Sequence, residues 1–191
     1  MLQLILGLVL FLGVHSVSIV ARPWRDAMVA RLGEWPWKGI YSVISLLGLV
    51  LIVRGYSEAR LDPVVLYSPP SWTHHLAMLL MLVAFPAAVA SAVPGRIQRA
   101  LKHPLLVAVK AWALAHLLVN GTLADVLLFG GFLAWAVADR ISLKRRVQGP
   151  TPQLPATAAN DFIVVGAGLA IYVAFLFWLH GALFGIPLIS R

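Results

Sequence analysis

The chain has 191 residues, of which 61% are hydrophobic and 12% are charged, whereas a soluble domain carries roughly 25% charged residues. Its mean hydropathy of +0.89 favours helices that lie in lipid. The net charge is +8, but the basic residues lie mainly in short segments between apolar runs, as in membrane proteins, so we predict no nucleic-acid partner. Cysteine is absent, which excludes disulfides, thiolate ligands and haem attachment through a CxxCH motif.

Six apolar segments are predicted to cross the membrane as helices, because about 20 apolar residues span the hydrocarbon core. The first lacks a basic n-region and exceeds the h-region of a signal peptide, so we expect it to be retained. A Pro- and Gly-containing surface linker is predicted at 139–161. With no internal repeat, residues 1–191 predict one all-α domain, a polytopic membrane helical bundle. The predicted spans are 2–20, 39–53, 72–93, 104–120, 122–138 and 162–184.

The basic residues predict how these spans are oriented. The loops after the first, third and fifth spans carry eleven Lys and Arg, including Arg146, against three on the other side, including Arg191. The positive-inside rule then places these three loops in the cytoplasm and both termini outside. The first loop also mixes tryptophans with its basic residues, which is typical of a segment at the lipid headgroup boundary.

Polar residues within the predicted spans indicate where a site would lie, because an ionisable group costs about 3 kcal/mol at the centre of a bilayer helix. His15, Ser18 and Arg22 are spaced by three and four, so they share one helix stripe that we expect to face the bundle. His116 is surrounded by apolar residues in the fourth span. Each of these histidines could belong to a functional site, or it could be a structural residue that is hydrogen-bonded to a carbonyl or hydroxyl. Both interpretations stay open.

The other ionisable groups have simpler explanations. Lys110 lies within the fourth span, where its stem can snorkel toward the interface or its ammonium group can pair with Asp125 of the next span. The remaining histidines are predicted near span ends and need no ligand there, although each stays an alternative to the internal pair: His74, His75, His103 and His180. We find no GxSxG, HExxH or P-loop motif. A helical bundle with internal histidines is a usual scaffold for bis-histidine haem b.

Two segments carry a family resemblance that covers most of residues 1–147. GVHSVSIVARPW, at 13–24, has an Arg-Pro seven residues after its histidine. KHPLLVAVKAWALAHLLVNG, at 102–121, joins a basic-His-Pro start to Trp-x-x-Ala-His and an Asn-Gly turn. Both resemble NnrU-like membrane proteins. The resemblance implies a multi-pass protein of the bacterial inner (cytoplasmic) membrane, linked to denitrification and nitric oxide metabolism, with denitrification proteins as partners.

The same segments are similar to zeta-carotene isomerase, a haem b enzyme that acts on a polyene. That similarity implies haem b with His15 and His116 as axial iron ligands, Lys110 or Arg22 beside a haem propionate, and a lipid or polyene substrate. This chain has Ala113 where the isomerase has a cysteine. With upright helices, the Cα atoms of the two histidines would differ in depth by roughly 12–14 Å.

Three functions therefore stay open from the sequence. The first is a haem b-binding membrane protein of the NnrU type. The second is a haem-dependent cis-trans isomerase of a polyene, and the third is a cofactor-free scaffold in which every histidine is structural. The residues alone do not decide whether the protein is an enzyme.

Overall fold

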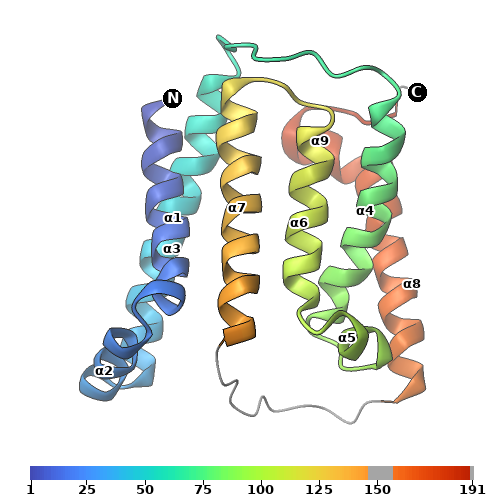
Figure 1. Cartoon of the computed structure of the whole chain (residues 1–191). Coiled ribbons are helices and arrows are strands. Elements are labelled where there is room, and N and C mark those ends of the chain that lie inside the picture. The colour runs from blue at the N-terminus through green and yellow to red at the C-terminus, as the bar shows by residue number, and fades with distance from the viewer. Residues whose placement is uncertain (146–156, 190–191) are drawn as a thin grey trace. The chain divides into compact units, whose positions relative to one another are not determined.

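The computed structural model describes residues 1–145 and 157–189, and within them every regular element is a helix apart from one isolated β-bridge (Figure 1). Arg146, Arg191 and the middle of the predicted linker lie outside the described residues. The helices are α1 (Leu2–Val20), α2 (Arg22–Leu32), α3 (Glu34–Ala59), α4 (Thr73–Ala90), α5 (Arg96–Leu101), α6 (Pro104–Leu117), α7 (Leu123–Arg145), α8 (Ala158–Ala174), the π-helix η1 (Phe175–Leu179) and α9 (His180–Phe184).

The predicted all-α membrane fold is confirmed. Five helical stretches are long and apolar enough to cross a membrane, namely α1, α3, α4, α7 and the continuous stretch Ala159–Phe184. The fourth predicted span, 104–120, corresponds to α6, whose 14 residues reach about 21 Å, less than the roughly 30 Å hydrocarbon core. The crossing by α6 and the orientation of the termini stay predictions.

Two helices are longer than their apolar runs. The second predicted span, 39–53, lies inside the 26-residue α3, which begins at Glu34 with an ion pair from Lys38 to Glu34 of 2.7 Å. Helix α7 continues from the predicted end at 138 to Arg145, so the predicted linker is helical at its start. Apolar content marks the lipid-facing part of a helix, whereas backbone hydrogen bonding continues through the polar residues beyond it.

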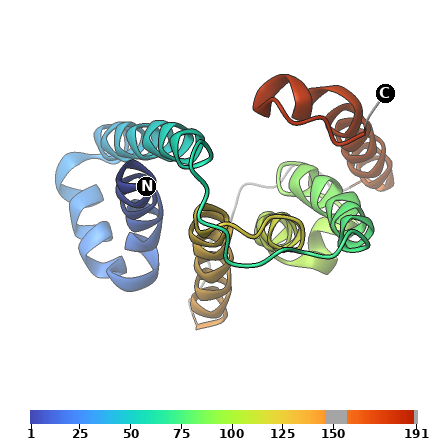
Figure 2. The ribbon, with the colours of Figure 1, turned by 90° about the horizontal axis from the view of Figure 1, so that it is seen from above.

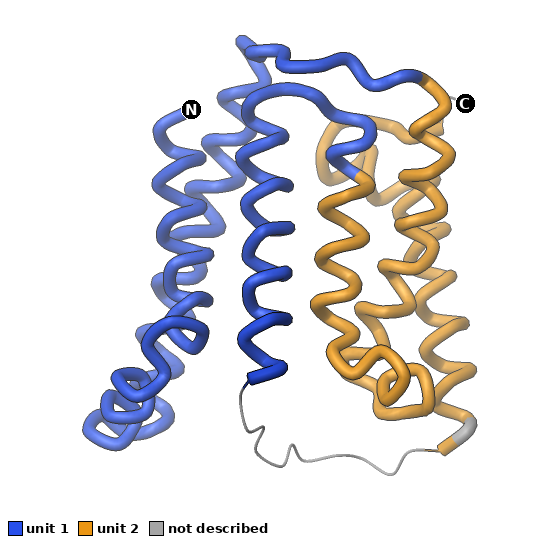
Figure 3. Tube along the Cα trace, viewed as in Figure 1, with its two compact units in different colours: residues 1–70, 116–147 blue, residues 71–115, 148–191 orange. Residues whose placement is uncertain are grey.

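The chain divides into two compact units, which are coloured separately in Figure 3. Unit 1 comprises residues 1–70 and 116–147, and unit 2 comprises 71–115 and 148–191. In unit 1, α1 packs along α3 and also contacts α7, and Figure 2 shows α1 and α3 side by side. Each unit is described by itself below.

Glycines allow the backbones of α1 and α3 to touch. A Cβ at Gly7 would lie 2.6 Å from the backbone nitrogen of Ile52, and a Cβ at Gly48 would lie 2.8 Å from that of Phe11. A Cβ at Gly55 would collide with the backbone of Leu4. Small residues at helix interfaces are the usual means of close approach in membranes, where lipid competes with apolar side chains.

Unit 2 has the same kind of contact between α4 and α8. A Cβ at Gly168 would lie 2.6 Å from the Cα of Pro86, which is inside α4. The start of α8 is tied to the start of α5, because the Asp161 carboxylate accepts a hydrogen bond from the backbone N–H of Ile97 at 3.1 Å. The side-chain amide of Asn160 donates to the Pro94 carbonyl at 2.7 Å.

Candidate functional site

His15 lies on α1 with one ring nitrogen already engaged. Its Nδ1 is 2.6 Å from the carbonyl oxygen of Phe11, one turn earlier. A carbonyl only accepts hydrogen bonds, so Nδ1 carries the proton and Nε2 keeps its lone pair. A histidine whose Nδ1–H is held by a backbone carbonyl has the tautomer and orientation of a metal-ligating imidazole.

Three aromatic rings from three helices of unit 1 surround this imidazole. Phe11 of α1 stacks on it with ring centroids 4.3 Å apart. Tyr41 of α3 meets it at 5.1 Å, and Trp135 of α7 meets it edge-on at 6.0 Å. The three rings pack against the imidazole, which is half-buried.

Trp135 also brings an unsatisfied donor to this position. Its indole Nε1–H is buried and has no hydrogen-bond partner within the described residues. Most buried polar groups are hydrogen-bonded, so this indole N–H could donate to an acceptor brought by a ligand. The environment of His15 therefore suits a ligand that carries an acceptor oxygen.

His116, at the end of α6, packs against a different part of α7. Its ring stacks on Phe129 with centroids 4.4 Å apart. Phe129, Phe132 and Trp135 are spaced by three and form one row on α7, which we call the α7 aromatic row. Phe11 contacts Phe132 at 5.6 Å and so joins His15 to the middle of this row.

The structure thus brings both predicted ligands into unit 1, but at different levels. His15 contacts residue 135 of the α7 aromatic row and His116 contacts residue 129, which are about 9 Å apart along the helix axis. The two histidines therefore contact α7 at different levels, and their depths in the membrane stay a prediction. Among the described residues, no group of three or more His, Asp or Glu side chains is placed to hold a metal ion.

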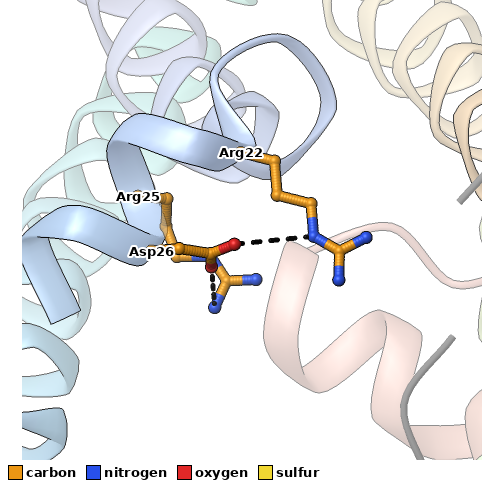
Figure 4. A network of polar contacts seen from close by, with 3 residues as sticks. All are labelled: Arg22, Arg25 and Asp26. Atoms are coloured by element: carbon orange, nitrogen blue, oxygen red, sulfur yellow. Dashed lines mark ion pairs between the residues drawn. The ribbon is translucent and has the colours of Figure 1, made fainter. Parts of the chain in front are cut away.

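The two predicted cationic residues lie in different units. Arg22, seven residues after His15, forms a 3.8 Å ion pair with Asp26, which also pairs with Arg25 at 3.1 Å (Figure 4). Lys110 is half-buried on α6 and belongs to unit 2, so it is described separately from His15. A contact of either residue with a propionate stays a prediction.

The other four histidines lie near helix ends. His74 and His75 are exposed in the first turn of α4, with Nδ1 atoms 3.0 and 3.3 Å from the Ser71 and Trp72 carbonyls. His103 directly precedes α6. His180 begins α9, and its Nδ1 lies 2.7 Å from the Ile186 carbonyl.

A buried carboxylate, Asp125, lies in the first turn of α7, and the sequence analysis gave it only as a possible partner of Lys110. Asp125 is 4% exposed, and it accepts hydrogen bonds from the Tyr56 hydroxyl at 2.6 Å and from the N–H and hydroxyl of Thr122 at 2.9 and 2.6 Å. The Thr-x-x-Asp spacing is a capping box and was detectable in the sequence. The partner Tyr56, 69 residues away, was not.

These features define a class of protein: a multi-pass helical membrane protein whose first compact unit holds a tautomerically fixed histidine among aromatic rings. The NnrU protein family model matches residues 3–188, and the chain therefore belongs to the NnrU family. This confirms the family predicted from the motifs around His15 and His116. No curated protein and no solved structure matches the chain.

Proposed function

We propose that this NnrU-family protein binds one haem b in the bacterial cytoplasmic membrane, with His15 Nε2 as one axial ligand and His116 as the second. The observation that carries the proposal is the combination of two features at His15: its Nδ1 lies 2.6 Å from the Phe11 carbonyl, which leaves Nε2 available to a metal, and its ring contacts aromatic rings from three helices. A bound haem supplies one-electron chemistry. The link to nitrite and nitric oxide reduction rests on the family resemblance.

The residues around His15 fit such a group. Phe11, Tyr41 and Trp135 pack against its imidazole. The orphaned Trp135 Nε1–H is a donor for an acceptor oxygen of the cofactor. His116 packs on Phe129, whereas His15 contacts the α7 aromatic row at Trp135. Because these positions lie at different levels of α7, we expect His116 to move off the Phe129 ring when haem binds.

Absorption spectra of detergent-purified protein, oxidised and then reduced with dithionite, test the proposal. After expression with ample haem, the wild type should show a Soret band and sharp reduced α and β bands. His15→Ala should lose the haem, because a fixed ligand and its orientation disappear together. His116→Ala should lose the sharp reduced bands, which report two strong axial ligands.

The matched control is His74→Ala, since His74 is exposed at a helix end and bonded to a local carbonyl. Its spectra should equal those of the wild type. Unchanged bands in His116→Ala would show that another residue is the second ligand. A flat visible spectrum in well-folded wild-type protein would rule out the haem.

A cofactor-free scaffold is the second candidate function. The observation in its favour is that both internal imidazoles already have protein partners, the Phe11 carbonyl and three rings for His15 and the Phe129 ring for His116. It predicts a flat spectrum together with normal function of the His15→Ala and His116→Ala variants in cells. For the isomerase interpretation, Ala113 offers no ligating atom in place of the cysteine.

A further inference from the structure

A surface groove of about 510 Å³ lies between α7 and the C-terminal end of α1, entirely within unit 1. From the α1 side it is lined by Ser18, Ile19 and Arg22, and from α7 by Ile141, Ser142 and Arg145. Among the residues that the structure describes, two arginines and two serines supply its polar lining. The proposed iron ligands, His15 and His116, are not part of this lining.

The charges at the groove favour an anion. Asp26 is the acidic partner of both Arg22 and Arg25, so these three residues together keep one positive charge, and Arg145 adds a second. The partial negative charge at the C-terminal ends of α1 and α7 opposes an anion but is only about half an elementary charge each. Guanidinium groups and hydroxyls together donate the several hydrogen bonds that a phosphate accepts.

The apolar part of the lining indicates that the anion belongs to an amphiphile. Ile19 and Ile141 lie beside the arginines, and Ile141 is 47% exposed on a helix that is long enough to cross the membrane. The volume lies within the 300–1,000 Å³ of ligand sites and suits a headgroup with the first methylenes of its chains.

The tryptophans nearby give the level of the groove in the membrane. Arg22 lines the groove and is the first residue of α2. Two residues later, Trp24 packs edge-on against Trp37 of α3 with ring centroids 5.9 Å apart. Tryptophans gather at the headgroup level of a bilayer, and basic residues beside them attract anionic lipids. The groove therefore combines cationic donors, an apolar wall and a position at the lipid headgroups.

We propose that this groove is a binding site for an anionic phospholipid, with the lipid phosphate between Arg22 and Arg145 and its acyl chains leaving over Ile19 and Ile141. Ser18 and Ser142 supply neutral donors to the same headgroup. The lipid joins the end of α1 to α7 and so stabilises unit 1 beside the His15 position.

Native mass spectrometry of the detergent-purified full chain tests the site, with added phosphatidylglycerol or phosphatidylcholine as the probe. The wild type should retain phosphatidylglycerol in preference to phosphatidylcholine. Arg22→Gln/Arg145→Gln should weaken phosphatidylglycerol retention about tenfold, because both charge-assisted contacts are lost. The matched control is Arg31→Gln/Lys144→Gln. Like the test variant it removes one charge from α2 and one from α7, but both residues are exposed and lie outside the groove, so retention should change by less than about twofold.

A second variant, Ile141→Trp, keeps every charge and fills the groove, so it should also lose phosphatidylglycerol. Because Ile141 is exposed, a tryptophan at this position should not disturb the packed interior, so misfolding would not explain the loss of lipid. Equal losses in the two double variants would overturn the site in favour of diffuse surface charge. Inorganic phosphate that displaces the lipid at millimolar concentration would overturn it in favour of a free-phosphate site.

Haem measured on the same samples separates this proposal from the function proposed above. If Arg22→Gln/Arg145→Gln lost its haem and kept phosphatidylglycerol, the groove would be a propionate site and the lipid assignment would be wrong. We expect Ile141→Trp, which keeps both arginines and both proposed histidine ligands, to retain its haem and lose the lipid. Because the lipid is counted directly, a wild type without haem would leave the lipid result standing.

Discussion

Unit 1 and unit 2 both bring helix backbones together at glycines, but they differ in what their helices enclose. The two histidines of unit 1, His15 and His116, pack on rings of phenylalanine, tyrosine and tryptophan. The histidines of unit 2 lie near helix ends, and three of them lie beside local carbonyls. These contacts therefore separate the histidines of unit 1 from those of unit 2.

Each unit also has a carboxylate that accepts a hydrogen bond from a backbone N–H at the start of a helix. The two carboxylates differ in burial. Asp125 of unit 1 is 4% exposed and has three donors, whereas Asp161 of unit 2 is half-buried and receives the Ile97 N–H. A buried acceptor is more expensive to remove than a partly solvated one, because the donors it leaves cannot turn to water. The comparison predicts a graded series of effects.

The largest effect is expected where the two units are alike, at the glycine contacts. Gly55→Leu should lower the free energy of unfolding by about 3 kcal/mol, since the new side chain meets the α1 backbone at Leu4. Gly168→Leu, against Pro86 in unit 2, should cost a similar amount. Thermal unfolding in mild detergent measures both.

Each glycine has a control on its own helix. Gly39 on α3 and Gly166 on α8 have open space where a Cβ would be, so Gly39→Leu and Gly166→Leu should be nearly neutral or stabilising. If Gly55→Leu and Gly39→Leu unfolded at the same temperature, the close approach of α1 and α3 would be wrong.

The next effect should distinguish the units. Asp125→Ala removes one acceptor from the Tyr56 hydroxyl and from two donors of Thr122, so we expect a loss of about 2 kcal/mol in the free energy of unfolding. Tyr56→Phe removes only one hydrogen bond and should cost about 1 kcal/mol. Glu58→Ala, an exposed acid on α3, is the charge control and should change little.

The double variant Tyr56→Phe/Asp125→Ala sharpens this prediction. Because Tyr56 and Asp125 share a hydrogen bond, its loss should be smaller than the sum of the two single losses. Strict additivity would contradict the 2.6 Å contact between them.

Asp161→Ala in unit 2 should have a smaller effect, of about 1 kcal/mol, which is typical of a lost helix cap. Water can reach the half-buried Ile97 N–H once the carboxylate is gone. Thermal unfolding of Asp161→Ala beside Asp125→Ala measures the difference directly. An equal or larger loss for Asp161→Ala would break the comparison between the two units.

Much of this arrangement followed from periodicity and motif spacing. Helix class, most helix positions and the family could be predicted because apolar runs and the motifs around His15 and His116 are local in sequence. The partners of His15 could not, since Tyr41 and Trp135 lie 26 and 120 residues away and only packing brings them together. The lengths of α3 and α7 were underestimated because their polar ends continue the helix beyond the apolar residues.

The smallest predicted effect is a pH dependence at Tyr67, which ties the segment before α4 to the chain around Asn120 within unit 1. Its hydroxyl donates to the carbonyls of Leu117 at 2.5 Å and Asn120 at 2.8 Å. Burial raises the pKa of Tyr67 above its ordinary value, and the nearby Asp125 carboxylate raises it further. The phenol therefore keeps its proton in the folded chain at a pH where the unfolded chain has begun to lose it.

That difference fixes the sign of the effect. Below about pH 10, the ordinary pKa of tyrosine, the stabilisation by Tyr67 is complete. Above it the unfolded chain binds fewer protons than the folded chain, so the free energy of unfolding falls as the pH rises through the raised pKa. Between about pH 9 and about pH 11, the wild type should therefore lose more stability than Tyr67→Phe. Parallel pH profiles for the two proteins would show that this hydroxyl has no special environment in the folded chain.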